Sequence, residues 1–402
     1  MAYKIFHTSQ YYCKICDFIG DHIAGFNLMG TIIDAKTNTK KEILSDTWVF
    51  KYPSIPAKLN SLYTNDSYNI VIFAEINLSD NLKELDIFIA KLDKIVETIG
   101  ISISYCISLS SSSKYIKPFT GLYNIIIDQT ILDGLDLSDV SFYCGNNAGR
   151  SVNWKYKQIG SEHIHVNKIG DKSKTDLYFA FNCKVQFMIP EVLFCNLDIN
   201  SINRNLFELI SRPYLNFDES INTAHGMEYI TKSINTYIET VKSPIMILFI
   251  GLPASGKTTL TNYILNNTII SSESWLSKDK ISNKRLYNLK LETLFEKGSH
   301  IIVDNTNIKC DDRLFHTSDA RKYGYKIIGI TIDTHADLIN HLNMFRVSTG
   351  EKSLIPKVVY NTMLKHLKTN GIKSTEFDLV LNYINQINPI CDNYKEIYDL
   401  YI

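Results

Sequence analysis

One segment constrains the fold of this chain more than any other, the glycine-rich stretch Gly-Leu-Pro-Ala-Ser-Gly-Lys-Thr at residues 251–258. It follows a wholly apolar run at residues 245–250 and precedes a helical pattern at residues 259–265. The order of strand, GxxxxGK[ST] loop and helix is that of a phosphate-binding loop, in which backbone N–H groups at a helix N-terminus surround a phosphate. This part of the chain is therefore expected to fold as an α/β domain with a parallel sheet.

The side chains of the loop have distinct expected roles. Lys257 should neutralise charge on the β- and γ-phosphates, and the Thr258 hydroxyl should hold Mg²⁺. The other residues expected to contact the nucleotide are Gly251, Ser255, Gly256 and Thr259. The expected nucleotide and cofactor are ATP and Mg²⁺.

Charged residues beyond the loop complete a candidate phosphotransferase site. A second apolar strand at residues 300–303 ends at Asp304, which would join Thr258 in holding Mg²⁺ because ligands of α/β sheets bind at the carboxyl ends of the strands. Two acids upstream, Asp279 and Glu273, are candidates for the base that accepts a proton from an attacking hydroxyl. Downstream, Arg346 precedes a glycine-containing loop at residues 348–351 and could neutralise the transferred phosphoryl group.

Composition and length exclude several other classes of protein. The chain has 402 residues, enough for two or three domains, and its 42 basic residues balance its 42 acidic ones. Binding driven by a global positive charge is therefore excluded, and any contact with nucleic acid must use a local patch. Ile, Asn, Lys and Tyr are abundant, which is typical of an AT-rich genome such as that of some large DNA viruses.

The sequence also favours a reducing, intracellular location, cytoplasmic rather than nuclear. No secretory signal is readable at residues 1–16, and no apolar run approaches the roughly 20 residues of a membrane helix. The eight cysteines lack the dense spacing of a disulfide scaffold. Cys13 and Cys16 form a CxxC without a second pair at zinc-site spacing, so no metal is expected there.

Two blocks with the rhythm of α/β sheets divide the chain. In the first, short apolar runs at residues 22–26, 69–73, 102–107 and 140–144 alternate with helical patterns such as residues 82–98. The second block restarts the rhythm at residue 245, after a polar stretch with a helical pattern at residues 226–241. We therefore expect domains at residues 1–200 and 244–402, joined by a connector at residues 201–243.

The motifs of both blocks resemble the bifunctional polynucleotide phosphatase/kinases. The kinase half is matched by the phosphate loop, by the Ile-Ile-Val-Asp-Asn-Thr-Asn segment at residues 301–307, and by Arg313, Arg321 and Gly324. The 3′-phosphatase half is matched in order by residues 24–31, 48–53, 71–73, 117–121, 142–150 and 153–154. The resemblance implies an N-terminal haloacid-dehalogenase-like domain followed by a P-loop kinase domain.

The phosphatase half departs from the family at its catalytic positions. Asn27 and Met29 stand where the family has the two aspartates of its nucleophile motif, and a carboxamide and a thioether cannot form a phosphoryl-aspartate or transfer a proton. Ala74 replaces a phosphate-binding hydroxyl, and Asn146 replaces a metal-binding acid. Lys117 and Asp176 persist. The resemblance therefore implies a degenerate phosphatase domain.

The kinase half keeps its parts. The family's proton-accepting aspartate falls on Asp279, with Glu273 as a rival because the interval from Lys257 is slightly long. Arg346 matches a lid arginine of the family, whereas Met344 replaces another. Around Asp279 lies a basic patch with interleaved aromatic residues, expected to hold phosphates and to stack a terminal base. The patch consists of Lys278, Lys280, Lys284, Arg285 and Lys290 with Trp275 and Tyr287.

These features predict a kinase that transfers phosphate from ATP to 5′-hydroxyl ends of DNA or RNA, with an end-repair enzyme or a ligase as a candidate partner. Three alternatives remain open from sequence. The first is a bifunctional 3′-phosphatase/5′-kinase, the second is a non-catalytic NTP-binding or structural protein, and the third is a small-molecule or protein kinase on the same fold.

Overall fold

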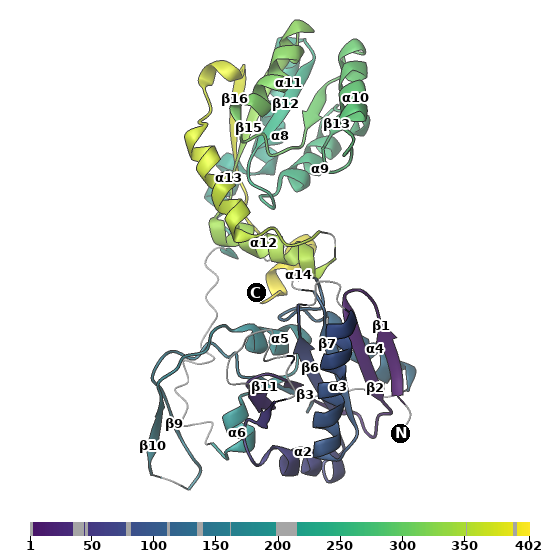
Figure 1. The fold of residues 1–402 in the computed structure, drawn as a ribbon. Coiled ribbons are helices and arrows are strands. Elements are labelled where there is room, and N and C mark those ends of the chain that lie inside the picture. Colours follow the sequence, from purple (N-terminus) through teal and green to yellow (C-terminus); the bar gives the residue numbers. More distant parts are fainter. Residues whose placement is uncertain are drawn as a thin grey trace. The chain divides into compact units, whose positions relative to one another are not determined.

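The computed structural model describes residues 3–34, 44, 47–77, 82–110, 113–134, 140–160, 162–197, 215–350, 352–388 and 392–402. The chain divides into two compact units. The first comprises Met1–Ser211 with Arg346–Ser353 and Asp399–Ile402, and the second comprises Arg212–Phe345 with Leu354–Tyr398. Figure 1 traces the chain through both units. No helix within the described ranges is both long and apolar enough to cross a membrane.

The first unit is built on a seven-stranded sheet with the order β1-β2-β7-β6-β3-β8-β11 (Figure 1). Five of these strands are parallel, and β1 and β2 extend one edge as an antiparallel pair. The strands of this sheet are β1 (Tyr3–His7), β2 (Tyr11–Cys16), β3 (His22–Asn27), β6 (Tyr68–Glu75), β7 (Ile103–Ser108), β8 (Phe142–Cys144) and β11 (Gln186–Met188). Two small antiparallel pairs are β4 (Ile33–Asp34) with β5 (Val49–Phe50) and β9 (Trp154–Lys157) with β10 (Ile164–Asn167).

Helices cover both faces of this sheet. Its helices are α2 (Ile55–Thr64), α3 (Leu82–Ile99), α4 (Gly121–Leu132), α5 (Thr175–Cys183) and α6 (Pro190–Phe194). Side chains alternate along a strand, so Ile70 and Ile72 of β6 pack against α2 and α3, whereas Val71 and Phe73 pack against α4 and α5. The two apolar layers leave the carboxyl ends of β3, β6 and β8 to carry polar residues.

The second unit is a five-stranded sheet, and all of its strands are parallel. Their order is β13 (Trp275–Leu276), β14 (Ile301–Val303), β12 (Ile245–Ile250), β15 (Lys326–Asp333) and β16 (Leu379–Ile384). Alternate residues of β12 again face two layers, with Ile247 among the side chains of α8 and α9 and Leu248 among those of α10 and α11. The fold class predicted from the sequence is thus confirmed.

The helices of this half of the chain are α7 (Glu219–His225), α8 (Met227–Val241), α9 (Lys257–Asn267), α10 (Lys284–Glu296), α11 (Cys310–Lys322), α12 (Ala336–Ser348), α13 (Lys357–Thr369) and α14 (Asp392–Asp399). Two short 3₁₀ helices are η4 (Ser272–Ser274) and η5 (Ser374–Glu376). The helical pattern predicted at residues 226–241 corresponds to α8, which Gly226 separates from α7. Seven of the eight cysteines fall in the described ranges, and all seven are free thiols.

Candidate functional site

The glycine-rich loop joins the end of β12 to the start of α9. Ala254 and Gly256 adopt positive φ angles of 56° and 94°, which curl the backbone before the helix begins at Lys257. A side chain at Gly256 would place its Cβ 2.7 Å from the Nδ2 atom of Asn385, so only glycine fits there. The loop therefore turns its backbone toward a helix N-terminus, the arrangement that binds phosphate.

Three other elements hold this loop in shape. The Ser255 carbonyl accepts hydrogen bonds from Asn385 Nδ2 at 3.1 Å and from Thr334 Oγ1 at 3.0 Å. The Tyr360 hydroxyl of α13 donates to the Pro253 carbonyl at 2.9 Å. Asn385 and Thr334 follow β16 and β15, so the loop is tied to the carboxyl ends of two neighbouring strands.

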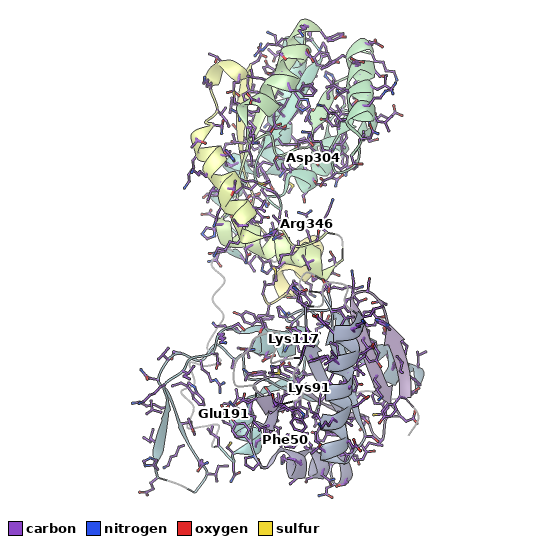
Figure 2. All side chains as sticks on the ribbon, viewed as in Figure 1. Phe50, Lys91, Lys117, Glu191, Asp304 and Arg346 are labelled. Atoms are coloured by element: carbon purple, nitrogen blue, oxygen red, sulfur yellow. The ribbon has the colours of Figure 1, made fainter. Side chains whose placement is uncertain are left out.

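Lys257, Thr258 and Asp304 lie together at the carboxyl edge of this sheet. The Thr258 hydroxyl donates to Asp304 Oδ2 at 2.9 Å, and the ammonium group of Lys257 donates to the carbonyl oxygens of Gly251 and Leu252 at 3.2 and 2.5 Å. Asp304, labelled in Figure 2, is only 6% exposed. A hydroxyl beside a carboxylate is the oxygen donor set that suits Mg²⁺, so these residues fit the ion that the loop implies.

Burial raises the pKa of the Asp304 carboxyl above its ordinary value, and the nearby charge of Asp279 adds to this increase. The Thr258 hydroxyl, the Lys257 charge and the Trp275 indole each act in the opposite direction. The carboxylate thus lies in a poorly solvated position, where a cation would stabilise its charged form.

Asp279 lies at the same edge of the sheet, whereas Glu273 does not. β13 pairs with β14 in parallel, Leu276 beside Val303, so the turn that carries Asp279 leaves the sheet next to Asp304. Glu273 lies in η4, before β13 begins. Both carboxylates are exposed, but only that of Asp279 is close enough to raise the pKa of Asp304. Of the two acids, Asp279 is therefore the one that lies near Asp304.

Asn305 is a residue of this site that the sequence analysis did not assign. Its Oδ1 atom accepts the backbone N–H of Lys278 at 2.9 Å, and its Nδ2 atom donates to the Tyr287 hydroxyl at 3.0 Å. Asn305 therefore connects the turn that carries Asp279 to α10. Its position directly after Asp304, at the end of a strand, is the sequence feature that could have identified it as a site residue.

The expectation that Tyr287 stacks a nucleic-acid base was wrong. The side chain is only 3% exposed, and its ring packs in the core beneath α10. Trp275 is half-buried, and the ammonium group of Lys280 lies 3.1 Å from the centre of its ring, so one face of the ring is covered. The basic residues Lys278, Lys280, Lys284 and Arg285 are exposed, and a phosphate-binding role is open to them.

Arg346, which is labelled in Figure 2, lies in the last turn of α12. The helix ends at Ser348, within the loop predicted at residues 348–351, and Glu351 lies outside the described residues. Met344 and Asn343 belong to the same helix. The Asn343 Nδ2 atom donates a hydrogen bond to the Ile355 carbonyl, and its Oδ1 atom accepts one from the Ile355 backbone N–H.

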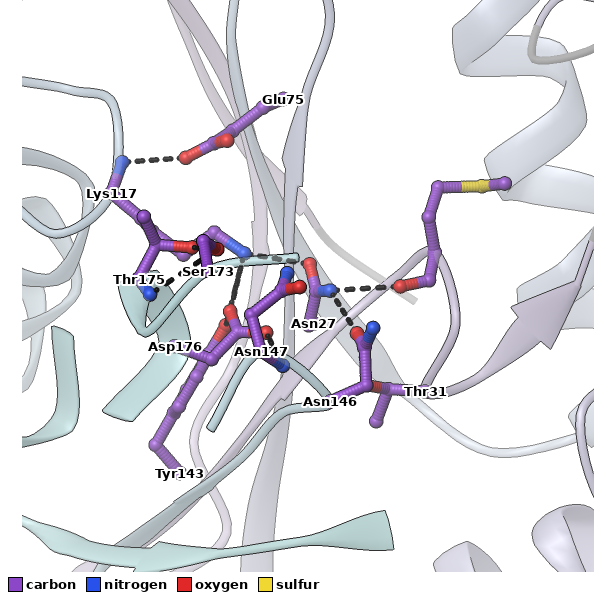
Figure 3. Close-up of polar contacts among 11 residues, drawn as sticks. Asn27, Thr31, Glu75, Lys117, Tyr143, Asn146, Asn147, Ser173, Thr175 and Asp176 are labelled. Carbon is purple, nitrogen blue, oxygen red and sulfur yellow. Dashed lines mark hydrogen bonds and ion pairs between the residues drawn. The ribbon is translucent and has the colours of Figure 1, made fainter. Parts of the chain in front are cut away.

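The first unit brings a second set of polar residues together at the carboxyl ends of β3 and β8, drawn in Figure 3. Asn27 Nδ2 donates to Asn146 Oδ1 at 2.9 Å and to the Met29 carbonyl at 2.8 Å. The Thr31 hydroxyl donates to the same Asn146 oxygen at 3.3 Å. These carboxamide oxygens are neutral, and that of Asn146 already accepts two protein donors, so the donor set does not fit Mg²⁺.

Lys117 and Asp176 form a buried ion pair beside the carboxamides. The Lys117 ammonium donates to Asp176 Oδ1 at 2.7 Å, to Asn27 Oδ1 at 2.7 Å and to the Tyr143 hydroxyl at 3.2 Å, which uses its three hydrogens (Figure 3). Burial would lower the pKa of Lys117, but the charges of Asp176 and Glu75 outweigh it and raise that pKa. Burial raises the pKa of Glu75, against the opposing effect of Lys117.

Two further positions complete this centre. Ala74 is buried on β6 and brings no hydroxyl to it. Tyr143, which the sequence analysis did not assign, donates to Asp176 Oδ1 at 2.9 Å, and the Asn147 backbone N–H donates to the other oxygen of that carboxylate at 2.9 Å. The signal for Tyr143 was its position between the motif residues of β8.

The two halves define a chain that joins a haloacid-dehalogenase-like domain to a P-loop domain of the phosphotransferase type. Residues 22–194 match the family Polynucleotide kinase 3 phosphatase, and residues 246–369 match the AAA domain family. The matched family and the relatives described below confirm the resemblance of this chain to the bifunctional polynucleotide phosphatase/kinases.

Three relatives illustrate this similarity. A protein of Acanthamoeba polyphaga mimivirus, provisionally named a bifunctional polynucleotide phosphatase/kinase, is 29% identical over 359 residues, which are 86% of this chain and 80% of the relative. The bifunctional polynucleotide phosphatase/kinase of Schizosaccharomyces pombe is 25% identical over 339 residues, 84% of this chain and 73% of the relative. The polynucleotide 3′-phosphatase ZDP of Arabidopsis thaliana is 29% identical over 189 residues, 43% of this chain and 24% of that protein.

Proposed function

We propose that this protein is an ATP-dependent polynucleotide 5′-hydroxyl kinase whose phosphatase-type domain is catalytically inactive. One observation carries the kinase proposal. The Thr258 hydroxyl, the Asp304 carboxylate and the turn bearing Asp279 converge at one edge of a parallel sheet, directly beside the phosphate loop. A metal-nucleotide site next to an exposed carboxylate is the arrangement that phosphoryl transfer to a hydroxyl requires.

The residues would divide the reaction between them. Backbone N–H groups of the loop bind the phosphates of ATP, and Lys257 neutralises charge on the β- and γ-phosphates. Thr258 and Asp304 would hold Mg²⁺, which would supply further positive charge to the site. The Asp279 carboxylate accepts the proton of the 5′-hydroxyl as that oxygen bonds to the γ-phosphorus. The bond from the γ-phosphorus to the bridging oxygen breaks, and ADP leaves.

The names of the relatives support nucleic acid as the acceptor, since two of them are described as polynucleotide phosphatase/kinases. The exposed lysines around Asp279 are consistent with phosphates on that acceptor. We propose 5′-hydroxyl ends of DNA or RNA as the substrate class, which would place the enzyme in nucleic-acid end repair.

The polar centre of the first domain supports the proposal that this domain is inactive. A covalent phosphatase needs an ionised carboxylate as nucleophile, and Asn27 has a carboxamide that is hydrogen-bonded through both of its polar atoms. Lys117 is committed to three protein acceptors. Asp176 forms a salt bridge with Lys117 and is fully buried, so it cannot replace the nucleophile.

Transfer of labelled γ-phosphate to 5′-hydroxyl DNA and RNA oligonucleotides tests the proposal, with 3′-phosphate release followed in the same samples. We expect transfer, a loss of at least about 1,000-fold in Lys257→Ala because the charge on the transferred group is no longer neutralised, and no 3′-phosphate release. Release of 3′-phosphate that survives in Lys257→Ala would indicate the bifunctional alternative. Binding of ATP without transfer to any oligonucleotide would contradict the kinase proposal and indicate an NTP-binding protein or a kinase for another acceptor.

A further inference from the structure

One face of the β9–β10 hairpin in the first unit carries side chains that are exposed or half-buried. In the hairpin, Lys155 pairs with Val166 and Lys157 with Ile164, and paired residues share a face. The opposite face includes Trp154, which is buried in the apolar layer of α4 and α5. Figure 1 shows the two strands extending away from the seven-stranded sheet. The ribbon is thus anchored by one face and presents the other.

The presented face combines apolar and cationic side chains. Ile164 is 59% exposed and Val166 is 48% exposed. The other large apolar residues exposed in and beside the hairpin are Val152, Ile159 and Ile169. Five lysines fall between residues 151 and 174, namely Lys155, Lys157, Lys168, Lys172 and Lys174. Of the two acids in that stretch, Asp171 is already paired with Arg150, so a positive charge remains.

The base of the hairpin joins the polar centre of the first unit. Arg150, which precedes β9, donates to the Asn146 carbonyl at 2.9 Å and to Asp171 beyond β10. The side chain of Lys174 lies directly over Gly149, in the loop that carries Asn146. The five lysines therefore lie along a segment that begins at this loop and ends beside it.

We propose that the β9–β10 ribbon is a binding surface for double-stranded nucleic acid. A two-stranded ribbon fits a groove of a duplex, where lysines contact phosphates and Ile164 and Val166 would contact sugars and base edges. A duplex is favoured over a single strand because the presented face carries aliphatic side chains, whereas single strands are bound by stacking on aromatic ones. Exposed apolar side chains gathered on one surface and bordered by polar ones are typical of interaction sites.

The inference rests on the proposed function only for the class of partner, because nucleic acid is the acceptor assigned to the kinase. It gives the first domain a role that needs none of the lost catalytic acids. A duplex would be held by this domain while its end is phosphorylated elsewhere on the chain.

Equilibrium binding of the full chain to a labelled duplex, without ATP and at several salt concentrations, tests the inference. Lys155→Glu/Lys157→Glu should weaken binding at least about tenfold near 0.1 M salt, and the slope of log K against log salt should be shallower by roughly 2. The matched control is Lys83→Glu/Lys94→Glu on α3, which makes the same change in net charge at two exposed lysines. Ile164→Ser/Val166→Ser should weaken binding several-fold without changing the slope.

Equal affinities for the hairpin and α3 charge variants would overturn the inference, as would tighter hairpin-dependent binding to a single strand than to a duplex. Circular dichroism and thermal unfolding confirm that the surface variants are folded. Phosphate transfer to a short single-stranded acceptor, measured in parallel, separates the two proposals. If the hairpin variants weaken duplex binding but no phosphate is transferred, only the kinase function is contradicted. If phosphate is transferred but the hairpin variants bind the duplex normally, only the proposed role of the ribbon is contradicted.

Discussion

Asp279 and Glu273 are both exposed acids near the phosphate loop, but only Asp279 follows β13 at the edge that carries Asp304. Asp279→Asn should lower the rate of phosphate transfer by about 100-fold to 10,000-fold, because the amide cannot accept the hydroxyl proton. Glu273→Gln, which removes a charge of the same sign six residues away, should change the rate less than about threefold. Single-turnover transfer measures both. A larger effect of Glu273→Gln would assign the base to the 3₁₀ helix instead.

Asp304 is expected to lower the stability of the folded chain while it serves the proposed phosphate transfer. Its pKa is raised in the folded chain, so its contribution to stability is present below its unfolded pKa of about 3.9 and is lost as the pH rises through the folded value. At pH 7 the buried charge is therefore unfavourable. Asp304→Asn should unfold at a higher temperature than the wild type at pH 7 in EDTA, yet lose phosphate transfer. The exposed Asp279→Asn is the control, and a lower melting temperature for Asp304→Asn alone would contradict the argument.

At the scale of elements, the position of the β13 turn depends on Asn305, which links Lys278 to Tyr287 on α10. Asn305→Ala leaves the Lys278 N–H and the Tyr287 hydroxyl without this partner, and should cost about 1–3 kcal/mol of unfolding free energy. The kcat should fall about tenfold while the KM for ATP stays unchanged, because the turn carries the proposed base Asp279 and not the proposed nucleotide site. Tyr287→Phe removes only the hydroxyl and should have the smaller effect on kcat. Equal losses in kcat and in ATP affinity would indicate general disruption of the sheet edge.

α11 introduces a pH-dependent contribution to the stability of the second unit. Burial, and then the charge of Lys278, lower the pKa of His316 from 6.5 to about 4. A histidine with a lowered folded pKa gives stability that is complete above its unfolded pKa and is lost as the pH falls toward 4, on the order of 3 kcal/mol here. His316→Phe keeps a ring against Tyr287 and Phe315 but does not titrate. Urea unfolding at pH 7 and pH 4 should therefore show a smaller loss in the variant, and equal losses would place the titration elsewhere.

Which elements could be predicted depends on how much of each is buried. The run at residues 245–250 is apolar at every position, and it forms β12 with the predicted bounds. β1 and β2 were not predicted, because an edge pair rich in Tyr and Lys lacks a continuous apolar run. The burial of Tyr287 could not be read from sequence either. A tyrosine among lysines suits an exposed helix face equally well, and only its bond to Asn305 explains the buried hydroxyl.

The residues of the candidate sites could be predicted from the sequence where they are close together in the chain, and their contacts could not be predicted where they are far apart. The phosphate loop could be read because all its chemistry lies in eight consecutive residues, 251–258. The contacts of Lys117 with Asn27, Tyr143 and Asp176 join residues 26 to 90 positions apart, and no periodicity relates such positions. The substitutions at Asn27 and Asn146 could be seen in the sequence, but their direct hydrogen bond could not.

For the molecule as a whole, the two domains should differ in their dependence on Mg²⁺. In the first domain, the Asn27 and Asn146 carboxamides hydrogen-bond directly where two carboxylates would repel each other without a cation. Restoring both acids with Asn27→Asp/Asn146→Asp should lower the unfolding free energy in EDTA by a few kcal/mol, about what like charges near 3 Å cost in a partly buried site. Mg²⁺ should recover most of that loss.

The comparison is made in a Lys257→Ala/Asp304→Asn background, so that Mg²⁺ binding in the second domain does not contribute to the shift. Without the restored acids, thermal unfolding of this background should not respond to Mg²⁺, because the side-chain oxygens of Asn27, Asn146 and Asp176 are neutral or already accept protein donors. A Mg²⁺-dependent rise in its melting temperature would mean that the carboxamide centre still binds the metal. That result would support the alternative in which the first domain is a phosphatase. A bound cation would add the positive charge that the ion pair of Lys117 and Asp176, which is neutral overall, does not provide.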